Sequence, residues 1–64
     1  MKEYTRVDNT GNTFRTVTFN SDNGEVAFVQ RNQKHDPDNW FLVTGLLPKA
    51  KAIEKIDFFC RFAQ

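Results

Sequence analysis

A catalytic or metal site needs side chains that can bind a proton, a metal ion or an electrophile, and this sequence offers few of them. His35, Asp36 and Asp38 stand close together in one polar segment, and Cys60 could join them from elsewhere in the chain. Dedicated metal sites usually show paired ligands at a set spacing, which these residues lack. We therefore interpret the segment as a solvated turn, and we predict no metal and no cofactor.

Nucleophilic catalysis would need Cys60 or a serine beside His35. Cys60 lies in an alternating apolar stretch, where a cysteine is usually an inert small hydrophobe. The three glycines stand apart, so no glycine-rich loop is available to cradle a phosphate. A chain of this size also leaves little scaffold to enclose a substrate pocket. We predict that the protein is not an enzyme and has no catalytic residues.

Arginines beside aromatic residues offer a second kind of chemistry, the binding of another macromolecule. Phe14 and Arg31 could share one face of a sheet, an arrangement that suits single-stranded nucleic acid. Phe59 beside Arg61, together with Phe41, has the composition of the centre of a protein interface. We predict these five residues as partner contacts. In so small a fold the same aromatic side chains could instead form the core.

The length and composition limit the architecture that can position these groups. The chain has 64 residues and one cysteine, so residues 1–64 are predicted to form a single domain without an internal disulfide. Aromatic residues make up 14% of the sequence, and seven of them are phenylalanine. A chain this small can be stabilised by a well-packed aromatic core or by self-association.

The net charge and the hydropathy argue against several classes of protein. The formal charge of +1 is too small for a strongly basic nucleic-acid arm or an acidic DNA-mimicking surface. The first residues are polar, unlike a signal peptide, and no stretch approaches the length of a membrane span. Together with the unpaired cysteine, this pattern predicts a cytoplasmic protein that does not bind membranes.

A β-hairpin around Asn23 and Gly24 is the clearest local signal. Residues 13–20 and 25–31 flank this dipeptide, which favours a two-residue type I′ turn. Such a turn would place Phe19 opposite Phe28 and Val17 opposite Gln30. One face of the hairpin is then apolar, formed by Val17, Phe19, Val26 and Phe28. The other face is mixed and half-exposed in character, formed by Phe14, Thr16, Thr18, Ala27, Val29 and Arg31.

The remaining segments predict further strands and one helix. Residues 2–7 are typical of a short edge strand. Residues 32–39 are predicted to form a polar loop. Residues 40–44 are predicted to form a strand whose consecutive large apolar side chains point to both faces. Residues 48–56 show helical periodicity, and residues 57–63 alternate as a final strand.

These elements predict an α+β fold, a small antiparallel sheet of four or five strands with one short helix before the last strand. The alternative is a small barrel of SH3-like or OB-like character. In the barrel, the aromatic side chains would close the interior. In the open sheet, Phe41, Val43 and Phe59 could form an exposed patch, because one short helix cannot cover both faces.

The sequence as a whole predicts a small non-catalytic binding protein that docks onto a protein partner through its sheet face or edge. A homodimer is a further option, because an exposed edge strand can pair with a second copy. By its size, the chain fits a phage or mobile-element-type inhibitor or modulator. The alternative function is the binding of single-stranded nucleic acid by a small β domain, through surface aromatics and arginine.

Overall fold

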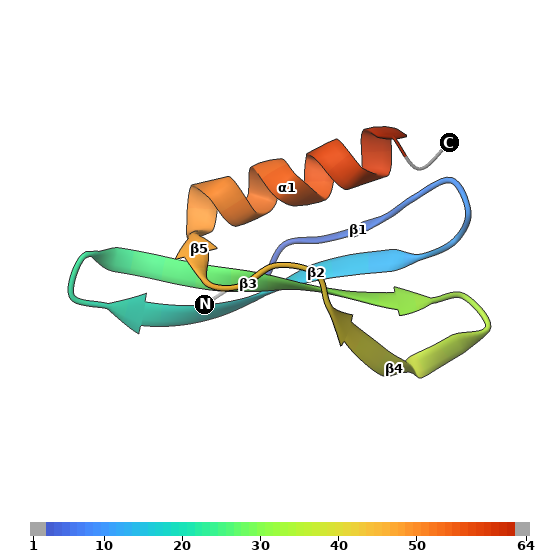
Figure 1. Ribbon diagram of the computed structural model, residues 1–64, viewed down its shortest axis with the longest axis horizontal. Helices are drawn as coiled ribbons and strands as arrows, with labels where there is room; N and C mark the ends of the chain where they lie inside the picture. Colours follow the sequence, from blue (N-terminus) through green and yellow to red (C-terminus); the bar gives the residue numbers. More distant parts are fainter. Residues whose placement is uncertain (1–2, 63–64) are drawn as a thin grey trace.

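The computed structural model describes residues 3–62 of the chain. The elements in chain order are β1 (Thr5–Val7), β2 (Thr13–Ser21), β3 (Gly24–Gln33), β4 (Asp36–Leu42), β5 (Leu47–Pro48) and α1 (Lys49–Phe62). The strands form one antiparallel sheet in the order β1-β2-β3-β4, and β5 pairs with β3. The helix lies along one side of this sheet (Figure 1). The fold is therefore an open α+β sheet, and the alternative of a closed barrel is wrong.

The β2–β3 hairpin forms the centre of the sheet, but its turn differs from the prediction. Residues 22–23 form the two-residue turn, and Gly24 follows it with a φ of 115°, a left-handed conformation that favours glycine. Phe19 therefore lies opposite Val26, whereas the predicted turn placed it opposite Phe28. Because the register differs by two residues, every side chain keeps its predicted face.

The helix packs on the mixed face of the hairpin, which the sequence indicated as half-exposed. Ala27 and Val29 on β3 and Thr16 on β2 are fully buried there. The small side chains of Ala27 and of Ala52 on α1 suit a close approach of helix and sheet. The core residues are Phe14, Ala27, Val29, Ala52, Ile56 and Cys60. The apolar face of the hairpin is consequently the one turned away from the helix.

The prediction of a final strand at residues 57–63 is wrong. The helix continues without a break to Phe62, and Ala63 lies outside the described residues. No glycine or proline interrupts the helix between its ends. Its buried residues recur at every fourth position, which places them on one side of the helix: Ala52, Ile56 and Cys60. Burial of this side against the sheet stabilises a helix where the local alternation indicated a strand.

The predicted loop at residues 32–39 is mostly strand. β3 extends to Gln33 and β4 starts at Asp36, so that only residues 34–35 remain as a turn. Pro37 is tolerated because β4 lies at the edge of the sheet, where an unpaired backbone position costs little.

The edge strand β1 and the residue before it are held to α1 by polar side chains. The Tyr4 hydroxyl donates a hydrogen bond to Asp57 Oδ1 at 2.6 Å, and Arg6 Nη1 lies 2.8 Å from the same oxygen. These hydrogen bonds from Tyr4 and Arg6 lower the pKa of the Asp57 carboxyl. They fix the position of β1 beside the helix. Among the described residues, no helix is long and apolar enough to span a membrane.

Candidate functional site

One face of the sheet has no covering element in the part of the chain that the structure describes. α1 lies on the other side (Figure 1), where it packs on β2 and β3. The strand register, with Trp40 placed by its contact to Arg15, gives the side chains of the uncovered face. We call this set the open face: Val7, Arg15, Val17, Phe19, Val26, Phe28, Gln30, Trp40 and Leu42.

Much of the open face is apolar and exposed to solvent. Val7, Phe19 and Leu42 are 58%, 48% and 68% exposed. Towards the middle of the hairpin the ring of Phe28 is half-buried, with its centroid 5.8 Å from that of Phe19. Single exposed apolar side chains are ordinary on protein surfaces, whereas several that share one uncovered face are typical of an interaction site.

Arg15 and Trp40 form a polar pair within the open face. The guanidinium carbon of Arg15 lies 3.7 Å from the centroid of the Trp40 ring, a cation–π contact. Arg15 Nε also donates a hydrogen bond to Gln30 Oε1 at 3.0 Å, which further orders the arginine. Among the paired residues that β1, β2 and β3 contribute to this face, Arg15 is the only charged one. Arginine and tryptophan are the residue types that most often dominate binding energy at protein interfaces.

Four of the five partner contacts predicted from the sequence lie together on the helix side of the sheet, where Arg31 lies between Phe14 on β2 and Phe41 on β4. Phe14 is 4% exposed and stacks on Phe59, with ring centroids 5.9 Å apart. Both rings therefore stabilise the core, and Phe14 offers no surface to a partner. Phe41 is 47% exposed and pairs with Arg31 near the end of β4, and Arg61 is exposed on α1. A binding role stays a prediction for the four residues that keep exposed surface: Arg31, Phe41, Phe59 and Arg61.

Sequence reasoning did not assign the open face as a site. It grouped the apolar residues of the hairpin correctly, but it did not identify which face the helix would cover. The sequence feature that could have identified the covered face is the small size of its side chains, because Ala27 and Thr16 leave room for a helix. The sequence alone could place Trp40 and Leu42 on the same face, since alternate residues of a strand point the same way.

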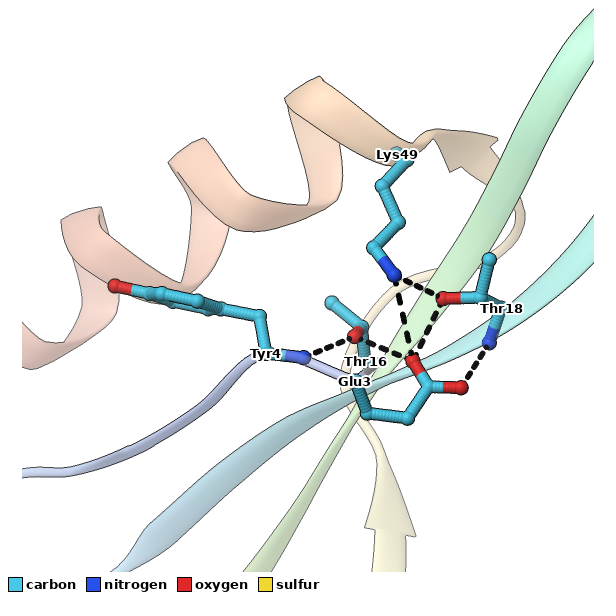
Figure 2. A network of polar contacts seen from close by, with 5 residues as sticks. All are labelled: Glu3, Tyr4, Thr16, Thr18 and Lys49. Atoms are coloured by element: carbon cyan, nitrogen blue, oxygen red, sulfur yellow. Dashed lines mark hydrogen bonds and ion pairs between the residues drawn. The ribbon is translucent and has the colours of Figure 1, made fainter. Parts of the chain in front are cut away.

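A second polar cluster joins the segment before β1 to β2 and α1 (Figure 2). Glu3 accepts hydrogen bonds from the Thr16 and Thr18 hydroxyls at 2.7 and 2.6 Å, and from the Thr18 N–H at 2.9 Å. Lys49 Nζ lies 3.6 Å from the carboxylate and donates a hydrogen bond to the Thr18 hydroxyl at 2.6 Å. The Glu3 carboxylate thus satisfies an N–H at the edge of β2 that a neighbouring strand would otherwise bind.

This cluster is suited to anchoring the chain and poorly suited to catalysis. Burial favours the neutral acid, but hydrogen bonds from Thr18 and Thr16, with the nearby charge of Lys49, lower the pKa of Glu3 to about 2. A carboxylate with so low a pKa is a weak general base near neutral pH. We therefore assign the cluster a structural role.

Replacing Glu3 with glutamine is predicted to lower the free energy of unfolding by about 1 kcal/mol near neutral pH. The pKa of Glu3 falls from its ordinary 4.5 to about 2 in the fold, so its stabilisation is complete above about pH 4.5 and is lost as the pH falls towards 2. Urea denaturation of both proteins at about pH 7 and about pH 3 measures this. The difference between them should shrink at the lower pH, and equal stability at pH 7 would exclude the anchoring role.

The groups that could support catalysis or metal binding are dispersed. His35 is exposed in the turn between β3 and β4, whereas Cys60 is buried on α1. Burial raises the pKa of the Cys60 thiol, which keeps it in the unreactive protonated form. Within residues 3–62, no three histidine, cysteine, aspartate or glutamate side chains gather where they could hold a metal ion.

Compared with known proteins, this chain matches no protein family, no curated protein and no solved structure. Its function must therefore be argued from the geometry and chemistry of its own surfaces. The open face carries three of the six large apolar side chains that are exposed in the described chain, together with an ordered arginine and tryptophan.

Proposed function

We propose that the protein is a non-catalytic binding protein that docks onto a protein partner through its open face. The observation that supports this most strongly is the combination of exposed Phe19 and Leu42 with the ordered Arg15–Trp40 pair on a face that no described element covers. A partner that covered this face would remove apolar surface from water, which favours the complex against the entropy cost of association. The docked partner would have its own surface blocked, so inhibition or modulation is the expected consequence.

The shape of the molecule supports the same proposal. Its radius of gyration is 11.6 Å, larger than the roughly 10.7 Å expected for a compact domain of this length. The longest axis measures 37 Å, and the β2–β3 hairpin runs along it (Figure 1). A long hairpin covered on one side only presents an extended face, a shape suited to another protein surface.

Single-stranded nucleic acid is the alternative ligand for such a face, because bases stack on exposed aromatic side chains of sheets. Nucleic-acid affinity, however, depends mainly on cations that neutralise phosphates. On the open face Arg15 alone could supply such a charge, and it already lies over Trp40. This charge distribution favours a protein partner.

Capture from a lysate, with and without nuclease, is the experiment that separates the two functions. If the open face docks a protein, the captured protein should be retained after nuclease treatment and after washes at high salt, because apolar contacts are not screened. Replacing Arg15 with alanine should weaken capture only partly. Loss of the bound material with nuclease, or a steep fall in binding with salt, would contradict protein docking and support nucleic-acid binding.

A further inference from the structure

We infer that the protein partner adds an extended segment of its own chain to β4, as a further strand of the sheet. This inference rests on the proposed function, because Trp40 and Leu42 of β4 also belong to the open face. It adds a binding mode, in which the partner pairs with the edge of the sheet as well as covering its face.

Two neighbouring residues of β4 are exposed on opposite sides of the sheet. Phe41 pairs with Arg31 on the helix side and is 47% exposed, whereas Leu42 lies on the open face and is 68% exposed. Within the described chain α1 does not reach β4, so the helix leaves Phe41 uncovered. A partner on the open face alone would cover Leu42 and leave Phe41 in water. A strand placed beside β4 would cover both, because its own side chains alternate between the two faces.

The backbone of β4 offers hydrogen-bonding groups at the same position. The Val43 N–H donates to the Val29 carbonyl of β3 at 2.8 Å. Because backbone direction alternates along a strand, the N–H and C=O of Leu42 point away from β3. The Trp40 side chain lies on the same face as that of Leu42, so its backbone groups point the same way. Within residues 3–62, β4 is the last strand on this side of the sheet (Figure 1), where these groups can bind an added strand.

The opposite edge of the sheet is protected against such pairing. β1 has only three residues, and before it the Glu3 carboxylate accepts the Thr18 N–H at 2.9 Å. On β4, Pro37 gives similar protection near the start of the strand, because proline has no N–H to donate. Residues 40–42 include no proline and no charged residue. The accessible edge of β4 is therefore short and lies at these residues.

The charges beside this edge indicate the chemistry of the added strand. Asp36 and Asp38 lie at the start of β4, and within residues 3–62 no cation forms an ion pair with either carboxylate. A lysine or arginine of the added strand would pair with these carboxylates. Apolar side chains at neighbouring positions of that strand would cover Phe41 on one face and Leu42 on the other. The partner segment is thus extended, apolar at adjacent positions and basic near one end.

Binding of the captured protein to Leu42→Pro and to Leu42→Ala, measured by titration, tests strand addition. Both variants lose the leucine side chain, but only proline also removes the outward N–H and blocks a strand at this edge. Leu42→Pro should therefore weaken binding at least about 10-fold more than Leu42→Ala. The fold tolerates proline at this position because the lost N–H points away from β3. Circular dichroism verifies that each variant is folded.

Phe41→Ser gives an independent test that leaves the backbone unchanged. Docking on the open face alone predicts no loss of affinity, because Phe41 lies on the other side of the sheet. Strand addition predicts a loss of at least about 10-fold. The matched control is Phe58→Ser, which replaces the same residue type at a similar exposure, 51% against 47%, on α1.

The outcomes separate strand addition from docking on the face. Equal binding by Leu42→Pro and Leu42→Ala, or equal binding by Phe41→Ser and Phe58→Ser, would overturn strand addition and leave docking on the open face in place. If Leu42→Pro does not fold, Phe41→Ser decides alone. Loss of binding with Leu42→Pro and Phe41→Ser but not with Phe19→Ser would support strand addition and contradict docking on the face.

Discussion

Replacing Ile56 with alanine is expected to remove a large share of the stability of the protein. Ile56 lies near the middle of α1 with no exposed surface, and it packs against the face of β2 and β3 that carries the core. Truncation of a buried isoleucine to alanine costs about 2–5 kcal/mol. A domain of this length has a total stability of roughly 3–10 kcal/mol. Far-UV circular dichroism during thermal denaturation measures the loss of stability directly.

The control for Ile56→Ala is Leu46→Ala in the segment before β5. Leu46 is 62% exposed, so its truncation should change the free energy of unfolding by no more than about 0.5 kcal/mol. If Ile56→Ala had the same denaturation midpoint as Leu46→Ala, the helix would not pack on the sheet through this side.

Replacing Phe19 and Leu42 together with serine is expected to abolish capture of the partner, with a loss of at least about 100-fold in affinity. Both side chains are about half exposed or more on the open face, so their removal takes little from the core. The denaturation midpoint should consequently stay close to that of the wild type. Capture should be measured for the double variant beside Phe58→Ser, which leaves the open face intact. Equal capture by the double variant and the wild type would exclude the open face as the docking site.

The hairpin and its two faces could be predicted from the sequence, since turn residues and alternation are local signals. The Asn23–Gly24 dipeptide located the reversal, and the side chains of Val17 and Phe28 share a face as predicted. The register was wrong by two residues because the turn lies one residue earlier, with Gly24 after it. A shift of two residues leaves each side chain on its original face, so the error did not alter the predicted surfaces.

The C-terminal segment could not be predicted from local alternation because its residues fit two periods. Phe58 and Cys60 alternate as in a strand, but Ala52, Ile56 and Cys60 also lie on one side of a helix. Packing against the sheet decides between the two patterns, and this is a tertiary effect. The absence of a helix-breaking residue was the stronger signal for a helix, since residues 49–62 include no glycine or proline.

The candidate site was only partly accessible to sequence reasoning. We predicted that one helix cannot cover both faces of a sheet rich in apolar residues. This prediction agrees with the uncovered face of the described chain. The choice of residues was only partly successful, because Phe14 was assigned to the surface and is instead buried in the core, where the partly buried Phe59 stacks on it. The composition indicates that the chain has more aromatic side chains than one covered face can bury. Only the position of the helix determines which of them remain exposed.

Fluorescence of Trp40 during titration with the captured partner tests docking through the open face most directly. Trp40 is the only tryptophan of the chain, and it lies on this face beside Arg15. A parallel titration of Trp40→Phe gives the signal of the partner alone, which is subtracted. Docking through the open face predicts that the Trp40 emission moves to shorter wavelength and that acrylamide quenches it less as the complex forms. A complex that forms with no change in the emission or quenching of Trp40 would contradict it.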